Sequence, residues 1–350
     1  MPLGFWTLGW IALVSLAALF GNLWAWLNPW TGLYALMGPI SPVVRLPEGL
    51  GLWPGTVMLV GFAAFLLADI APDDPTRLAQ FVAVYWLVTF CGLILCGRSW
   101  LKHFELGQAI FAAYASLAPL RLAAPAGIGG PGWQVVLVKP AHAAGVFALM
   151  LLAVGSFDGL NETYWWLGQI GVNPLEFPGR SAVVLQTLAG LGLAILSLFA
   201  VFGLTIWLGL MISGEDVGFR RTFGLLALSV MPIALVYHVA HYLTSFMVSI
   251  QYTIAAINDP FAVGADWMGI EPFRVTTGFF NNIKSVRTIW ITQACLVVVG
   301  HVWSVLLAHR IALALFTNER RAAIATLPLS LFMIGYTLLG LWLLAAPKGA

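Results

Sequence analysis

The chain has 350 residues, of which 61% are hydrophobic and 9% are charged, and its net charge is +2. A soluble domain carries about 25% charged residues because water must solvate its surface. So few charges exclude a soluble globular protein and leave lipid as the main solvent. The sequence contains no basic run and no RNA-binding pattern, so we do not expect nucleic acid as a partner.

Eight stretches are apolar over roughly the 20 residues that a helix needs to cross a bilayer. They cover residues 5–21, 52–70, 78–96, 141–157, 182–211, 223–257, 288–316 and 326–346. The first has no basic segment before it and no clear small-residue cleavage site, so we expect a retained helix rather than a signal peptide. The sequence therefore predicts an all-α polytopic transmembrane helix bundle with about eight spanning helices.

Residues 104–120 form a ninth apolar stretch, which is flanked by charges and ends in Ala118-Pro119. We expect it to be an interfacial or re-entrant helix. The sequence has no repeat of fixed period and no Gly/Ser-rich or Pro-rich linker. Residues 1–350 are therefore expected to form a single integral membrane domain, with the long connections 97–140 and 258–287 packed back onto it.

The distribution of Lys and Arg predicts the orientation, because these residues are enriched in cytoplasmic loops. Eight spans place both termini on one side, and that side holds six basic residues: Arg77, Arg180, Arg274, Lys284, Arg287 and Lys348. The opposite side holds ten: Arg45, Arg98, Lys102, Arg121, Lys139, Arg220, Arg221, Arg310, Arg320 and Arg321. We therefore predict a multipass protein of the cell membrane with the ten-residue side in the cytoplasm and both termini facing outward.

Three histidines lie inside the predicted spans, where ionisable groups are costly and mark candidate sites. His238 and His241 are three residues apart on the sixth span and share one helical face, and His301 lies near the middle of the seventh. Antiparallel neighbours would bring the three imidazoles together, where they would ligate a divalent, zinc-like metal. Ordinary hydrogen bonds between helices explain the same residues equally well, and a haem held by two histidines is a less favoured alternative.

Two acidic residues on the outer side are candidates to complete this site or to orient a water molecule. Asp158 directly follows the fourth apolar stretch and is expected to face His241. Asp259 follows the sixth stretch, with Asp266 and Glu271 further along the same loop. A solvated loop end is the commonest role of such carboxylates, so both interpretations stay open.

Two further residues have expected roles beside this site. Pro232 lies six residues before His238 and is expected to bend the sixth span, because proline removes a backbone hydrogen bond. His103 belongs to a basic junction, residues 97–105, which is expected to be wetted among lipid headgroups.

Several short strings resemble bacterial membrane proteins of the fenitrothion hydrolase family. They are residues 21–24 with 27–30, 156–160 with 165–166, 241–244, 258–261, 300–302 and 308–310, so the resemblance extends from the first span to the seventh. One departure is Leu23, which stands at a predicted turn where relatives often have proline. The resemblance implies an organophosphate triester hydrolase that acts with membrane partners.

The leading hypothesis is thus metal-assisted hydrolysis of an apolar organophosphate ester within the membrane. In this hypothesis His238, His241 and His301 hold the metal, and Asp158 or Asp259 acts in catalysis. The expected partners are the lipid bilayer, an apolar small molecule, and another membrane protein or a second copy of the chain. The alternative is a transporter or membrane-complex subunit that uses the same histidines for proton relay or for haem or metal binding. A purely structural subunit is a third possibility.

Overall fold

The computed structural model describes residues 2–38, 41–121, 126–137, 142–176, 179–270 and 273–348, and these are mostly helical. Seven helical segments within these ranges are long and apolar enough to cross a membrane. They are Leu3–Phe20 (η1 and α1), α5 (Pro75–Cys96), α9 (His142–Asn161), α11 (Val184–Ser213), Phe219–Asn258 (α12, η5 and α13), α14 (Ile283–Leu315) and α15 (Glu319–Ala345). The predicted all-α, multipass membrane bundle is confirmed.

Shorter elements connect these helices. They are α2 (Trp24–Leu27), α3 (Pro29–Leu36), η2 (Glu48–Leu50), α6 (Arg98–His103), α8 (Trp133–Leu137), α10 (Tyr164–Gln169), η3 (Pro174–Glu176), η4 (Arg180–Ala182) and η6 (Gly278–Asn281). Strands β1 (Leu120–Arg121) and β2 (Gly127–Ile128) form a small antiparallel hairpin. Three positions that the sequence predictions use, Lys139, Ala141 and Glu271, lie outside the described residues.

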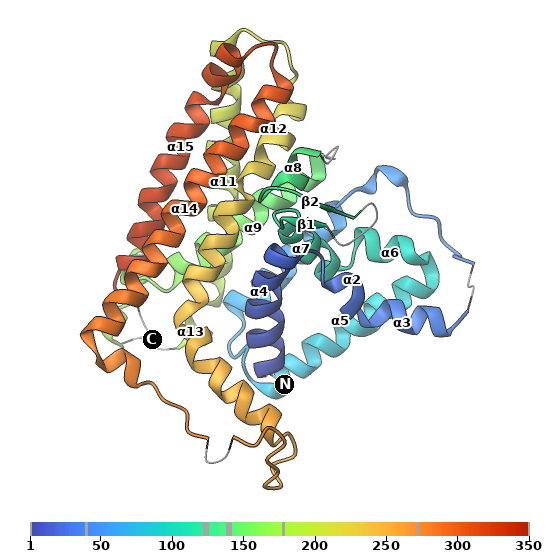
Figure 1. The fold of residues 1–350 in the computed structure, drawn as a ribbon, viewed down its shortest axis with the longest axis vertical. Coiled ribbons are helices and arrows are strands. Elements are labelled where there is room, and N and C mark those ends of the chain that lie inside the picture. Colours follow the sequence, from blue (N-terminus) through green and yellow to red (C-terminus); the bar gives the residue numbers. More distant parts are fainter. Residues whose placement is uncertain are drawn as a thin grey trace.

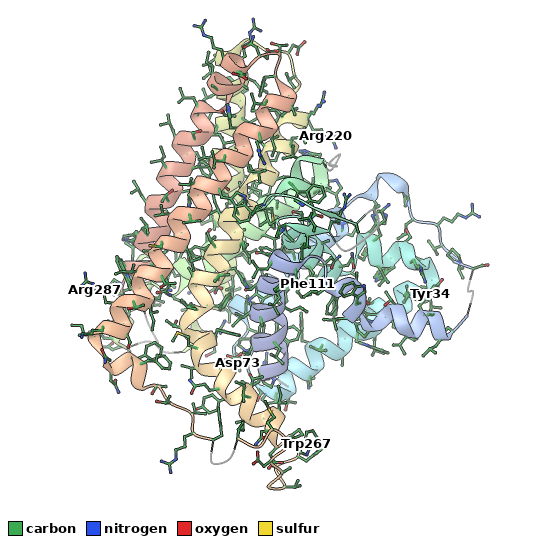
Figure 2. The ribbon with its side chains drawn as sticks, viewed as in Figure 1. Tyr34, Asp73, Phe111, Arg220, Trp267 and Arg287 are labelled. Carbon is green, nitrogen blue, oxygen red and sulfur yellow. The ribbon has the colours of Figure 1, made fainter. Side chains whose placement is uncertain are left out.

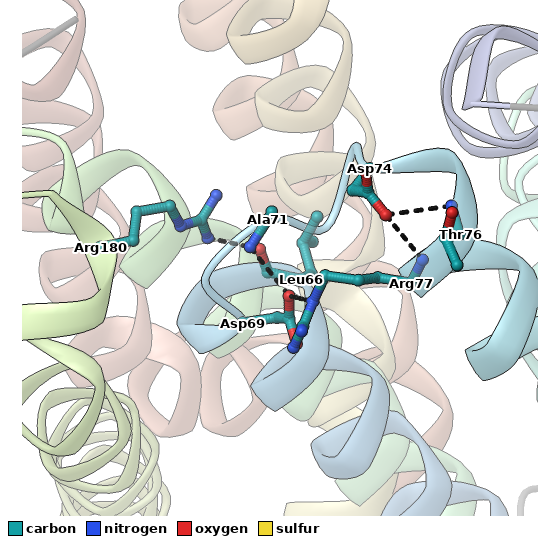
Figure 3. Close-up of polar contacts among 7 residues, drawn as sticks. All are labelled: Leu66, Asp69, Ala71, Asp74, Thr76, Arg77 and Arg180. Atoms are coloured by element: carbon teal, nitrogen blue, oxygen red, sulfur yellow. Dashed lines mark hydrogen bonds and ion pairs between the residues drawn. The ribbon is translucent and has the colours of Figure 1, made fainter.

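The remaining predicted span forms α4 (Trp53–Ala68), whose 16 residues give a length of about 24 Å, shorter than a typical hydrocarbon core. Figure 3 shows how its end is held. The Arg180 guanidinium donates to the carbonyl oxygens of Leu66 and Leu67 at 2.8 and 2.7 Å, which satisfies carbonyls that the helix itself leaves unpaired. Arg77 binds Asp69 at 2.6 Å, and this bond holds the pKa of the Asp69 carboxyl below its usual value.

Helix α9 is the centre of the bundle, in contact with α4, α11, α12 and α13. Its side chains are almost all buried from Ala143 to Val154, so this helix faces protein on every side. Gly145 allows a close approach to α12, because a Cβ at that position would overlap the backbone of Gly224. Small residues at such crossings are typical of helix packing in membranes.

The sixth predicted span is helical throughout, but a short 3₁₀ turn just before its proline divides it into two α-helices. Helix α12 (Phe219–Ala227) passes through the 3₁₀ turn η5 (Leu228–Val230) into α13 (Met231–Asn258), and Pro232 occupies the first turn of α13. The Ser304 hydroxyl of α14 donates to the carbonyl oxygen of Ser229 inside this turn. The irregular backbone is therefore tolerated because a neighbouring helix satisfies a polar group there.

The ninth apolar stretch forms α7 (Leu106–Ala115), a helix of 10 residues that packs on α1 (Val14–Phe20). Its Tyr114 is buried and its ring centroid lies 6.1 Å from that of His238 on α13. This segment therefore packs against the interior of the bundle, and the structure does not distinguish an interfacial from a re-entrant helix.

A buried carboxylate holds the start of α7. Glu105 accepts hydrogen bonds from Trp24 Nε1 and Asn28 Nδ2, and further ones from the Tyr85 hydroxyl and from the backbone N–H groups of residues 107 and 108. Burial raises the pKa of the Glu105 carboxyl, and the hydrogen bonds from Trp24, Tyr85 and the backbone N–H groups of residues 108 and 107 offset part of the rise. Leu23, just before α2, has φ −64°, a value that a proline would also have.

The prediction that His103 is wetted is wrong. Its side chain is buried, with 5% of the residue exposed, and Nδ1 lies 2.6 Å from the carbonyl oxygen of Gly51. The basic neighbours of His103 favoured a wetted position. The sequence does not indicate the contact with Gly51, because it joins two segments that are 52 residues apart.

Figure 1 shows the two ends of the bundle. The α11–α12 and α14–α15 connections lie at the upper end, whereas the α13–α14 connection and the marks of both termini lie in the lower half. In Figure 2, Arg220 is labelled toward the upper end and Trp267 at the lower end. Between the ends, large apolar side chains of α11, α14 and α15 are exposed, among them Leu193, Leu196 and Val302. This apolar belt is the surface expected to face lipid.

Candidate functional site

A carboxylate and an imidazole meet where α9 approaches α13. Asp158 lies in the last turn of α9, and its Oδ2 is 3.3 Å from Nε2 of His241 on α13. The hydroxyl of Tyr242 donates to the same oxygen at 2.5 Å. The Asp158 and His241 side chains are 12% and 7% exposed, so the pair is almost closed to solvent. The predicted approach of these two residues is confirmed.

Glu162 completes a group of three. It lies just beyond the end of α9, four residues after Asp158, and four residues on a helix is the spacing that places side chains on one face. Ligand atoms of Asp158, Glu162 and His241 all lie within 4.8 Å of one another. In the part of the chain that the structure describes, this is the one such group of three His, Cys, Asp or Glu residues. Glu162 is exposed, so solvent reaches the three-residue group at the Glu162 carboxylate.

A small cavity of ≈ 20 Å³ lies on the inner side of this group. Its lining combines polar and aromatic side chains, including Trp10, Tyr114, Asp158, His238, His241 and Tyr242. That volume holds about one water molecule. The cavity is therefore large enough for one water molecule that relays a proton or acts in hydrolysis, but it is too small for an organic substrate.

His238 belongs to this cavity but faces the N-terminal helix η1 (Leu3–Leu13). Its Nε2 donates to the carbonyl oxygen of Trp10 at 3.0 Å, and its ring centroid lies 5.0 Å from that of Tyr242. Because a carbonyl oxygen only accepts, Nε2 carries the proton and is not free to bind a metal. His238 is a neighbour of the three-residue group rather than a member of it.

His301 is not part of the site. Its Nδ1 donates to the carbonyl oxygen of Val297 at 2.7 Å within α14, and its ring faces Tyr336 of α15 at 6.4 Å between centroids. His301 Nε2 has no hydrogen-bond partner among the described residues. The structure therefore does not bring the three predicted histidine ligands together.

Helical phase explains this separation. Helices α13 and α14 touch at Val236 and Gly300, because a Cβ on Gly300 would overlap the Val236 side chain. Each residue turns a helix by about 100°. His238, two residues past Val236, consequently points away from α14, and His301, one residue past Gly300, turns toward α15.

Asp259 is also outside the site. It follows the end of α13, and its carboxylate accepts hydrogen bonds from the backbone N–H groups of Val263 and Gly264 at 3.0 and 2.8 Å. These bonds, the one from Val263 first, lower the pKa of Asp259. Its role is to cap an exposed turn.

Three residues near the site were missing from the sequence-based set. Tyr242 directly follows His241, and Lys348 places its ammonium 3.1 Å from Oε2 of Glu162. Glu162 is the third of these residues. Its spacing of four from Asp158 was a signal that identifies a shared helical face, whereas no local pattern links Lys348 to residue 162.

Comparison of the chain with models of known protein families, with curated proteins and with solved structures gives no match in any of the three. One imidazole and two carboxylates within a few ångströms form a donor set that suits zinc and related divalent ions.

Proposed function

We propose that this protein is a multipass membrane hydrolase whose centre is a divalent-cation site formed by Asp158, Glu162 and His241. The observation that carries the proposal is the 3.3 Å separation of Asp158 Oδ2 and His241 Nε2. Two ligands at about 2.1 Å from a tetrahedral zinc ion lie about 3.4 Å apart. The two atoms therefore already have the spacing of neighbouring ligands, with a second carboxylate within reach.

Three protein ligands are the usual number in catalytic zinc sites, which leave a further position for water. Such a metal supplies a Lewis acid and a water molecule with a pKa near 7. Tyr242 orients Asp158 through its hydroxyl, which fixes one carboxylate oxygen in place. His238 remains on the inner side, where the water-sized cavity connects it to the group.

The substrate would reach the site from the outer surface, since the cavity holds only about one water molecule. Glu162 and the neighbouring Tyr164 and Trp165 are exposed there. Tyr and Trp favour the membrane–water boundary, and an apolar ester would concentrate in the same region.

The resemblance to the fenitrothion hydrolase family supports this substrate class. Two of the strings that carry it, residues 156–160 and 241–244, come together in the folded chain through Asp158 and His241. An aryl phosphate triester is thus the proposed substrate. The same proposal places the site on the periplasmic side of the inner membrane, following the ten-to-six distribution of basic residues.

A binding experiment followed by an activity assay tests the proposal. The full-length protein in detergent would be titrated with zinc against a competing chelator, and an aryl dialkyl phosphate triester would then be added. Asp158→Asn should weaken zinc binding by about tenfold or more and abolish hydrolysis. Asp259→Asn is the matched control, since it changes the charge equally on an exposed turn and should match the wild type. Equal behaviour of the two variants would refute the proposed site.

A proton-relay subunit is the second candidate, because Asp158, Tyr242 and His238 line a cavity that fits one water molecule. The His238→Asn variant separates the two functions. A relay predicts that this variant loses proton flux in liposomes under a pH gradient while its zinc affinity is unchanged. A hydrolase predicts no proton flux in the wild type either.

A further inference from the structure

We propose that Lys348 is a tethered cation that competes with the divalent metal for Glu162 and so sets the affinity of the site. This inference rests on the proposed metal site. The Lys348 ammonium lies 3.1 Å from Glu162 Oε2, which is one of the three candidate ligand groups. Glu162 cannot keep this ion pair and also give its full charge to a metal.

The backbone holds this segment in place independently of the lysine side chain. Lys348 forms an antiparallel bridge with Thr163, the residue next to Glu162. The backbone N–H of Tyr164 donates to the carbonyl oxygen of Pro347 at 2.9 Å. These backbone contacts bind the residues after α15 to the turn that follows α9. They place the Lys348 ammonium at the edge of the site.

The charges around Lys348 favour this arrangement. Asp158 and Glu162 bring two negative charges close together, and one positive charge from Lys348 offsets part of their repulsion. The Lys348 and Glu162 side chains are 32% and 43% exposed, so the ion pair meets water and is easily exchanged. Exposed pairs of this kind contribute little free energy, which makes Lys348 a weak competitor that a divalent ion displaces.

When a divalent ion displaces the Lys348 ammonium from Glu162, the surroundings of this ammonium change. It remains tethered beside the metal site by the backbone bridge, while its ammonium becomes free to turn toward solvent. Its reactivity toward amine reagents should therefore report metal binding, and this readout needs no catalytic turnover.

The first test measures zinc affinity in full-length protein. Lys348→Met removes the charge and keeps the backbone contacts, so zinc affinity should rise by up to about fivefold. Lys284→Met is the matched control, because Lys284 lies at the start of α14 on the same outer side and its removal changes the net charge equally. The control should bind zinc as the wild type does. Equal affinities of wild type and Lys348→Met would overturn the inference and leave the metal site itself standing.

The second test uses acetylation of lysines, followed by mass spectrometry, with and without zinc. Zinc should speed the acetylation of Lys348 and leave that of Lys284 unchanged. An unchanged rate at Lys348 in protein that binds zinc would contradict displacement. Absence of zinc binding in wild type, Lys348→Met and Asp158→Asn alike would end both the metal proposal and this inference.

Discussion

The hydroxyl of Tyr237 lies directly against the backbone of Gly159, so closely that a Cβ at position 159 would overlap it. Gly159 therefore allows α9 and α13 to approach where Asp158 meets His241. We predict that Gly159→Ala pushes the helices apart, destabilises the protein by about 1–3 kcal/mol and weakens zinc binding. Thermal unfolding in detergent and a zinc titration measure the two effects.

The control for this change is Gly168→Ala in α10. No atom lies within 4 Å of a Cβ built at that glycine, so the added methyl group meets open space. Alanine also favours a helix over glycine, and the variant should be as stable as the wild type or slightly more so. Similar losses in both variants would show that the Gly159 contact has no special role.

The Glu105 carboxylate should be essential for the N-terminal half of the fold. Glu105→Ala leaves five buried donors without their acceptor, including Trp24 Nε1 and Asn28 Nδ2, and each such group costs about 1–3 kcal/mol. We expect a loss of about 3 kcal/mol or more in the free energy of unfolding. Glu176→Ala, at an exposed position, should change it by less than about 0.5 kcal/mol.

The pH dependence of stability follows from the same residue. Burial raises the pKa of Glu105 in the folded state, so its contribution to stability is complete below the unfolded pKa and is lost as pH rises through the folded pKa. Glu105→Gln carries no charge at any pH. The melting temperature of this variant relative to the wild type should therefore rise as the pH increases above about 4, the usual pKa of a glutamate. A difference that falls over this range would contradict the expected direction.

The orientation is tested by cysteine labelling of intact cells with a reagent that does not cross the membrane. We predict that Lys284→Cys, at the start of α14, is labelled from outside and that Arg221→Cys, in α12, is not. Both positions lie within the described residues. The opposite labelling pattern would place both termini in the cytoplasm and move the site to the inner face.

Asp158 and His241 should behave as a unit in metal binding. If they bind one ion together, Asp158→Asn and His241→Ala should each remove most of the affinity, and the double variant should lose little more. His301→Ala should keep wild-type affinity, since its ring faces α15.

The apolar runs predicted the helices because their length and composition are local properties. The approach of Asp158 to His241 was also predictable, since each follows or lies in a run of known direction. The grouping of His238 with His301 was not, because it depends on which faces of α13 and α14 touch. That choice is made at Val236 and Gly300, where side-chain size, rather than any polar pattern, sets the rotation of the helices. The contact of Lys348 with Glu162 could not be predicted either, because the two residues lie far apart in the sequence.

The most direct test of the metal site is an anomalous difference map from crystals of zinc-loaded, full-length protein. The proposed site predicts one strong peak at about 2.0–2.2 Å from His241 Nε2 and from carboxylate oxygens of Asp158 and Glu162. The ammonium of Lys348 should have moved away from Glu162 in the same crystals. A zinc peak at His301 or in the Asp259 turn, with none beside Asp158, would contradict the account.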